Sequence, residues 1–165
     1  MIIISDTSVM INLAQIGHLS LLPQIFPEII IPEAVFKEIT HGDKPLPGAT
    51  EIVEADWLSV ASPIDDNLIL SLLDEIDLGE AEAIVLAIER KADFLLIDER
   101  RGRSVARRYK LDHLGILGIL LQAKTLGLIS QVKPLLDRLI NEARFYIGAK
   151  QRSLNNCPIW LAFLG

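Results

Sequence analysis

The chain has 165 residues, of which half are apolar and 23% are charged, with a net charge of −6 and one cysteine, Cys157. This length predicts one globular domain, and a lone cysteine excludes both a disulfide framework within the chain and a cysteine zinc cage. We therefore expect a protein of the reducing cytoplasm. The negative charge argues against nonspecific nucleic-acid binding by the overall field, and no apolar run reaches the ~18 residues needed to span a bilayer, so no membrane partner is expected.

Short β-branched runs alternate with helical patterns along the chain. Residues 41–50 hold two glycines and two prolines and are expected to form a loop. Thr7 or Ser8 and, near the end, Ser130 are the expected helix N-caps. In chain order, the predicted elements are a strand at 2–5, helices at 8–15 and 18–25, a strand at 29–31, a helix at 33–40, a strand at 57–61, helices at 65–76 and from 77 onward, a strand at 94–97, a helix at 103–110, a strand at 113–116, and helices at 117–126 and 130–144.

This alternation predicts an α/β fold in which a parallel sheet carries helices on both faces. The pattern occupies residues 1–143. The remaining residues, 144–165, include four aromatic side chains but show little periodicity. We therefore treat them as a C-terminal tail and leave its role open.

Two of the predicted strands end in an aspartate. Asp6 follows the strand at 2–5, and Asp98 follows the strand at 94–97. Because ligands of open parallel sheets bind beyond the carboxyl ends of the strands, we expect the two carboxylates to share an acidic site. The alternative is that each aspartate only caps the helix that follows its strand.

Two glutamates are further candidates for this site. Asp77 and Glu80 have the spacing of a capping box, which would explain Glu80 by helix capping alone. In the functional interpretation, Glu80 instead points along the sheet towards Asp98. Glu38 is expected to be half-buried on its helix, and a half-buried glutamate needs a partner such as a metal ion or an arginine.

A basic segment follows Asp98 directly. Six of the 16 lysine and arginine residues fall within eleven positions: Arg100, Arg101, Arg103, Arg107, Arg108 and Lys110. Phosphate contacts from such a segment position RNA without reading its sequence. A solvated helix face or a surface for an acidic protein are the alternatives. We favour RNA binding, through Arg100, Arg101, Arg103 and Arg107.

Taken together, the motifs of residues 1–143 resemble a PIN domain, and among PIN domains the prokaryotic proteins related to VapC-type toxins. The motifs occur in the order of that family and are Asp6-Thr7-Ser8, Pro32-Glu33-Ala34-Val35 with Glu38, 78–84 and 95–103. The resemblance implies a PIN-like three-layer α/β/α fold with a mostly parallel five-stranded sheet. It also implies a Mg²⁺- or Mn²⁺-dependent endoribonuclease, the toxin of a toxin–antitoxin pair, with RNA as substrate, a small antitoxin protein as partner, and a homodimer.

The resemblance also assigns roles to individual residues. By position, the catalytic acids would be Asp6, Glu38, Glu80 and Asp98, of which all but Glu38 would hold the metal ion. Thr7 or Ser8 would supply a nearby hydroxyl, and Glu99 would stand near a further acidic position. Such carboxylates suit Mg²⁺ or Mn²⁺, which activates water for phosphodiester hydrolysis.

One position departs from the family pattern. Relatives tend to have Gly-Thr-Leu-Gly after the last strand, whereas this chain has Ile116 in place of the threonine. The missing hydroxyl is expected to weaken or abolish activity. A non-catalytic PIN-fold module that binds RNA or a protein is therefore the second hypothesis, and a small-molecule phosphohydrolase with the same metal site is the third.

Overall fold

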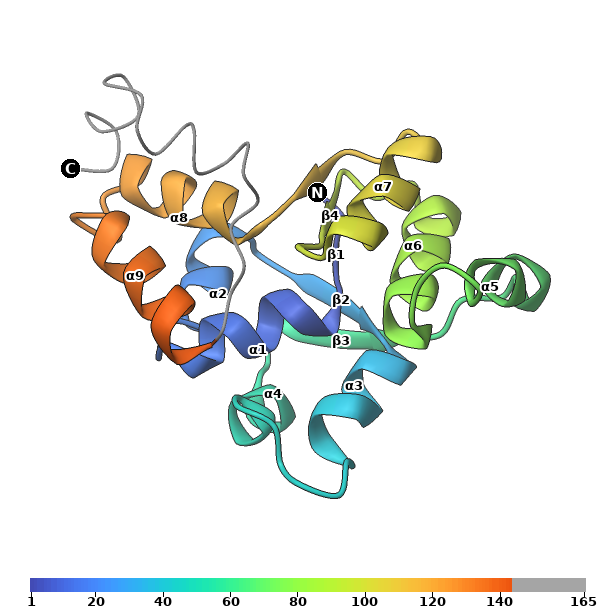
Figure 1. The fold of residues 1–165 in the computed structure, drawn as a ribbon, viewed down its shortest axis with the longest axis horizontal. Coiled ribbons are helices and arrows are strands. Elements are labelled where there is room, and N and C mark those ends of the chain that lie inside the picture. The colour runs from blue at the N-terminus through green and yellow to red at the C-terminus, as the bar shows by residue number, and fades with distance from the viewer. Residues whose placement is uncertain (144–165) are drawn as a thin grey trace.

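The computed structural model describes residues 1–143, which form a single five-stranded sheet between two layers of helices (Figure 1). All strand pairs are parallel, in the order β3-β2-β1-β4-β5. The strands are β1 (Ile3–Ser5), β2 (Ile29–Pro32), β3 (Leu58–Ala61), β4 (Phe94–Leu96) and β5 (His113–Leu114). The predicted three-layer α/β/α fold is confirmed.

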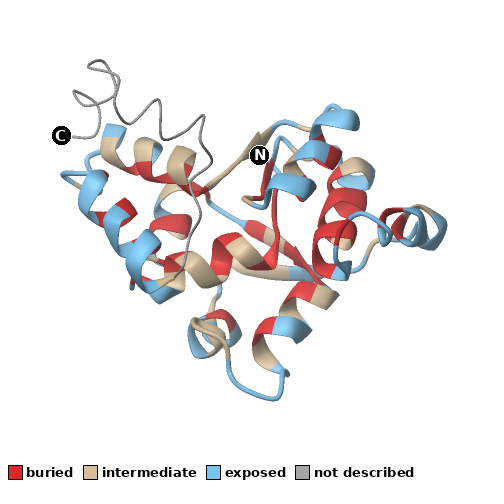
Figure 2. Ribbon diagram, in the orientation of Figure 1, coloured by how far each residue is buried: buried red, intermediate tan, exposed pale blue. Residues whose placement is uncertain are grey.

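The helices divide between the two faces of the sheet because successive strand residues point to opposite sides. Ile3 faces a core built from α1, α2, α3, α4, α8 and α9, whereas Ile4 faces a core built from α5, α6 and α7. Both isoleucines are fully buried. In Figure 2 the buried positions lie along the sheet and on the helices beside it. The helices are α1 (Thr7–Gln15), α2 (Leu21–Ile25), α3 (Glu33–Thr40), α4 (Ala49–Glu54), α5 (Asp66–Leu72), α6 (Leu78–Arg90), α7 (Arg100–Arg108), α8 (Ile116–Thr125) and α9 (Lys133–Glu142).

Several local predictions were wrong at helix ends. Asp6, rather than Thr7 or Ser8, is the N-cap of α1, because its carboxylate accepts a hydrogen bond from the Val9 N–H. Ser130 does not cap α9, which begins three residues later at Lys133. The glycines and prolines of the 41–50 segment hid α4, whose N-cap Gly48 has a φ of +86° that suits glycine.

Two further boundaries matter for the site. Helix α7 begins at Arg100 instead of residue 103, so the basic segment lies on a helix from its first residue. Ile116, predicted to end the last strand, is instead the first residue of α8, and its side chain is fully buried. Within residues 1–143, no helix has the length and apolar character needed to cross a membrane. The predicted tail, 144–165, lies outside the described residues.

Candidate functional site

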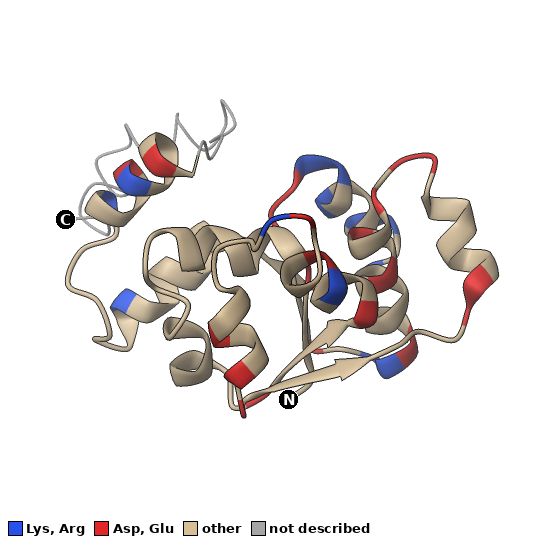
Figure 3. Ribbon diagram, turned by 90° about the horizontal axis from the view of Figure 1, so that it is seen from below, with Lys and Arg blue, Asp and Glu red and all other residues tan. Residues whose placement is uncertain are grey.

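The sheet topology brings the two aspartates together. Strands β1 and β4 are neighbours, with Ser5 paired to Leu96, and the Asp6 N–H donates to the Leu96 carbonyl at 3.0 Å. Asp6 and Asp98 therefore leave the sheet at the same edge, as the sequence predicted. Helices α6 and α7 pack together beside this edge, and Figure 3 shows acidic and basic positions close to one another there.

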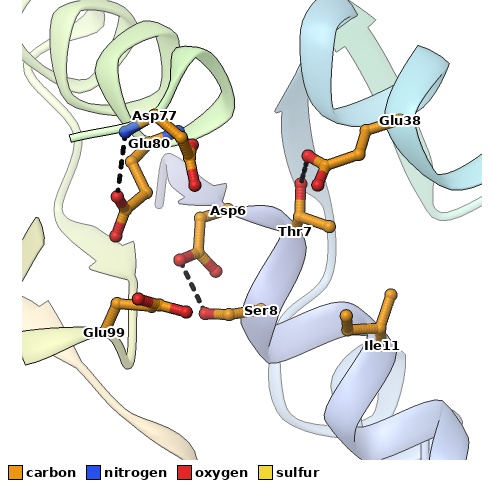
Figure 4. A pocket seen from close by; sticks show the side chains of 8 residues that line it. All are labelled: Asp6, Thr7, Ser8, Ile11, Glu38, Asp77, Glu80 and Glu99. Atoms are coloured by element: carbon orange, nitrogen blue, oxygen red, sulfur yellow. Dashed lines mark hydrogen bonds between the residues drawn. The ribbon is translucent and has the colours of Figure 1, made fainter. Parts of the chain in front are cut away.

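A small pocket, partly open to solvent, lies at this edge (Figure 4). It contains six of the residues that the sequence indicated, Glu99 among them, but not Asp98. The lining residues are Asp6, Thr7, Ser8, Ile11, Glu38, Asp77, Glu80 and Glu99. Asp77 was interpreted from the sequence only as a helix cap, and its place beside Glu80 in the capping box was the available signal. Nothing in the sequence pattern indicated Ile11.

Asp6 lies at the centre of the pocket and is only 1% exposed. Its Oδ1 accepts from the Val9 N–H at 3.0 Å, and its Oδ2 accepts from the Ser8 hydroxyl at 2.7 Å. Burial raises the pKa of Asp6 to about 8, against the two hydrogen bonds, and the negative charges of Glu80 and Asp98 raise it further. Asp6 thus caps α1 and is also a buried carboxyl surrounded by other carboxyls.

Glu80 is 6% exposed and takes part in the predicted capping box. Its Oε2 accepts from the Asp77 N–H at 3.3 Å, whereas its Oε1 is buried and has no hydrogen-bond partner among residues 1–143. Burial raises the pKa of Glu80 to about 7, together with the charges of Asp77, Glu99 and Glu38. The capping interpretation is confirmed, but these charged neighbours do not include Asp98, towards which Glu80 was expected to point.

A glycine makes room for the unpaired oxygen of Glu80. A Cβ atom added to Gly102, in the first turn of α7, would lie 2.5 Å from Glu80 Oε1 and 2.5 Å from Ile97 Cδ1. Real Cβ atoms do not approach other atoms this closely. The Arg-Gly-Arg sequence at the start of α7 therefore allows the helix to pack directly against the carboxylate.

Asp98 turns towards the start of α8. Its carboxylate accepts a hydrogen bond from the Ile116 N–H and lies against Gly115, where an added Cβ would be 2.5 Å from Oδ1. Burial raises the pKa of Asp98 to about 6, although the Arg103 guanidinium and the Ile116 N–H favour the ionised form. Glu99, not Asp98, is the N-cap residue of α7, so the simple capping alternative does not hold for Asp98.

Glu38 was expected to be half-buried, and this is wrong. Its residue is exposed, and its Oε2 accepts from the Thr7 hydroxyl at 2.6 Å. The hydroxyl can hold the carboxylate because Gly79 lets α6 approach closely, with an added Cβ only 3.2 Å from Glu38 Oε2. Thr7 and Ser8 thus each donate to a different carboxylate of the pocket.

All of the basic segment except Lys110 lies on α7, next to the pocket. Arg100, Arg101 and Arg107 are exposed and make no ion pair within residues 1–143. Arg108 instead binds Glu75 through two hydrogen bonds of 2.7 and 3.1 Å. Three of the four arginines predicted to bind RNA are therefore available to an external anion.

The donor set can be compared with the needs of a divalent cation. Among the described residues, no three aspartate, glutamate, histidine or cysteine side chains converge as a ready set of metal ligands. The pocket nevertheless offers carboxylate oxygens, which hard cations such as Mg²⁺ and Mn²⁺ prefer, and the buried Glu80 Oε1 has no hydrogen-bond partner in the described part of the chain. Asp6 and Glu80 fit a cation by their chemistry, with Asp98 beside them, although they do not form a closed cage.

Comparison with known proteins agrees with this description. The model of a family described as a PIN domain (DUF3368) matches residues 2–154. A search of curated proteins finds no match. PIN domains are generally nucleases and typically depend on divalent metal ions. Since the family model covers most of the sequence and the sheet has the expected architecture, the chain belongs to the PIN-domain family.

Proposed function

We propose that this chain is a metal-dependent endoribonuclease that hydrolyses RNA phosphodiester bonds. The observation that supports this most directly is the carboxylate pocket at the ends of β1 and β4, where Glu80 Oε1 is buried and finds no partner among the residues that the structure describes. A buried carboxylate oxygen without a hydrogen bond is costly, and a cation would satisfy it. The raised pKa values of Asp6, Glu80 and Asp98 have the same origin in burial, so a bound cation would stabilise all three ionised groups.

In this proposal Asp6, Glu80 and Asp98 would hold Mg²⁺ or Mn²⁺, and the bound ion would supply activation of a water and charge neutralisation on the phosphate. Ser8 fixes the orientation of the Asp6 carboxylate through its 2.7 Å hydrogen bond. Thr7 similarly fixes Glu38 at the open side of the pocket, where Glu38 can accept a proton from an attacking water.

Helix α7 would bind the RNA backbone. Arg100, Arg101 and Arg103 stand in its first four positions, and no acidic residue lies in the first turn. Cations are unfavourable at a helix N-terminus because of the helix dipole. An anionic phosphate beside these side chains would reverse that unfavourable arrangement, and phosphate contacts would orient RNA without reading its sequence.

The test is cleavage of a defined single-stranded RNA by the purified protein with Mg²⁺, with Mn²⁺, and with EDTA. We expect cleavage that requires the cation and that falls by at least about a hundredfold in Asp6→Asn and in Asp98→Asn. Asp112→Asn serves as a control because Asp112 is exposed at the far end of β5. Circular dichroism verifies folding. Equal cleavage by wild type and both site variants would refute the proposal and indicate a contaminating nuclease.

The cellular role follows from the family resemblance and is proposed on that ground. We propose that the protein acts in the cytoplasm as a homodimeric toxin that a small antitoxin protein holds inactive. Induced expression of the chain should stop growth, and co-expression of a neighbouring small reading frame should restore it. Normal growth under strong induction of an RNA-cleaving protein would contradict the toxin role while leaving the ribonuclease proposal intact.

A non-catalytic RNA- or protein-binding module is the second candidate. Two observations favour it: no three ligand side chains converge among residues 1–143, and the fully buried Ile116 offers no hydroxyl at the start of α8. In that case the folded protein would take up no Mn²⁺ but would still bind RNA. Binding should then weaken in Arg101→Ala, and no cleavage should occur at any cation concentration.

A further inference from the structure

Arg103 differs from the other arginines of α7. Its side chain is only 24% exposed, and its Nη1 lies 3.9 Å from Asp98 Oδ1. Its Nε is buried and has no hydrogen-bond partner in the described part of the chain. Arg108, by contrast, donates two short hydrogen bonds to Glu75. Arg103 is therefore close enough to neutralise Asp98 but is not locked to it by a hydrogen bond.

The backbone on both sides makes room for this pair. The Arg103 N–H donates to the Glu99 carbonyl at 2.9 Å, which holds Arg103 one helical turn after the strand end that carries Asp98. On the opposite side, an added Cβ at Gly115 would lie 2.5 Å from Asp98 Oδ1 and 3.6 Å from Arg103 Nη1. The guanidinium and the carboxylate thus share one small corner at the edge of the pocket.

We propose that Arg103 is the resident counter-cation of Asp98 and that its charge opposes the binding of divalent cations in the pocket. This inference rests on the proposed function. A guanidinium cannot lose its proton in a protein, so its positive charge is present at every working pH. A divalent cation that uses Asp98 must either tolerate this charge or displace the side chain, and both requirements lower its affinity.

The proposal also gives a role to RNA in cation binding. A backbone phosphate beside α7 would attract the Arg103 guanidinium, whose Nε has no hydrogen-bond partner within residues 1–143 and whose Nη1 lies 3.9 Å from Asp98 Oδ1. Drawing the guanidinium away from Asp98 would remove the opposing charge. By linkage, RNA would then strengthen cation binding, and the cation would strengthen RNA binding by the same factor.

The experiment measures Mn²⁺ affinity by isothermal titration calorimetry at low ionic strength, without RNA. We expect Arg103→Met to bind Mn²⁺ roughly tenfold more tightly than wild type, because a like charge has been removed. Arg103→Lys keeps the charge and should stay within about threefold of wild type. Arg90→Met makes the same change of net charge about 15 Å along α6 from Glu80, and should change the affinity by less than about twofold.

The sign of the result separates this role from a merely structural one. If Arg103 only packs the site, its removal should disorder the pocket and weaken Mn²⁺ binding, and either weaker or unchanged binding in Arg103→Met would overturn the inference. A second measurement is independent of the cation and compares two backgrounds in EDTA. Arg103→Met should lower the melting temperature more when it is introduced into the wild type than when it is introduced into Asp98→Asn. Equal losses in both backgrounds would also overturn it.

Failure of the proposed function gives a different result. A wild-type protein that binds no Mn²⁺, while Arg103→Met gains binding, would support the inference and show that the wild-type site is closed by its own arginine. A wild type and an Arg103→Met variant that both bind no Mn²⁺ would refute the metal-dependent function and the opposition to cations together.

Discussion

Replacing Asp6 by asparagine should stabilise the cation-free protein at alkaline pH while it removes a proposed metal ligand. Asp6 is 1% exposed, and burial raises its pKa from 3.8 to about 8. In the unfolded chain the carboxyl ionises near its ordinary pKa, whereas in the folded protein it holds its proton until about pH 8. The folded state therefore binds more protons than the unfolded state between these values, and the free energy of unfolding falls as pH rises through this range.

The magnitude follows from the pKa difference. One pKa unit corresponds to about 1.4 kcal/mol, so the pKa difference of Asp6 lowers the free energy of unfolding by up to about 5 kcal/mol at pH 8, where the unfolded carboxyl is ionised and the folded one still largely holds its proton. Relaxation and water entry around the charge reduce this to a few kcal/mol. Asparagine has no charge to bury, its Oδ1 can still accept from the Val9 N–H, and its Nδ2 can donate to the Ser8 oxygen. The variant should keep the N-cap of α1.

The assay is urea unfolding in EDTA at pH 5 and pH 8, with wild type, Asp6→Asn and the exposed control Asp112→Asn. We expect Asp6→Asn to gain a few kcal/mol over wild type at pH 8 and about 2 kcal/mol or less at pH 5. Asp112→Asn should match wild type at both values. An Asp6→Asn variant that is no more stable than wild type at pH 8, or that gains equally at both pH values, would refute the reasoning about the buried charge.

Three further predictions follow from the same pocket. Gly102→Ala should lower the free energy of unfolding by about 1–2 kcal/mol and weaken Mn²⁺ binding, because the added Cβ would displace the Glu80 carboxylate and the gain in helix propensity offsets only part of the cost. Thermal unfolding measures the stability and calorimetry measures the Mn²⁺ affinity. An unchanged Mn²⁺ affinity would contradict the role of Glu80. Thr7→Val should lower the rate of RNA cleavage without unfolding the protein, since only the hydrogen bond to Glu38 is lost. Full cleavage activity of this variant would show that Glu38 needs no fixed orientation. Arg101→Ala should weaken RNA binding and reduce the slope of log affinity against log NaCl concentration by about one charge. Fluorescence anisotropy titrations at several NaCl concentrations measure this slope. An unchanged slope would place the RNA elsewhere.

Much of the architecture was predictable because the governing interactions are local or periodic. The runs of β1 and β4 are short, mostly apolar and mostly buried, as is typical of strands covered on both faces. The apolar stripe of α6 and its Asp77–Glu80 capping box mark that helix within a few residues. Helix α4 escaped prediction because turn-forming residues precede it and it contributes only Ile52 to the buried core.

The residues of the site were easier to predict from the sequence than the geometry in which they are arranged. That two aspartates follow two strands is visible in the sequence, and parallel strands must present their carboxyl ends at one edge. How far each carboxylate is buried depends on side chains from distant segments, such as Thr7 against Glu38 and Gly102 against Glu80. These contacts have no periodicity, so the exposure of Glu38 could not be read from its place on a helix.

The sequence by itself therefore determined the α/β class, the strand ends that carry Asp6 and Asp98, and the basic segment that follows, because these depend on residue type and short-range spacing. Only the tertiary structure decided which groups face one another. Asp98 faces Arg103 and the start of α8, and one oxygen of Glu80 is buried with no hydrogen-bond partner within residues 1–143. The physical reason is that burial and Coulomb interactions depend on distance in space. The packing of α6, α7 and α8 around the sheet edge sets those distances.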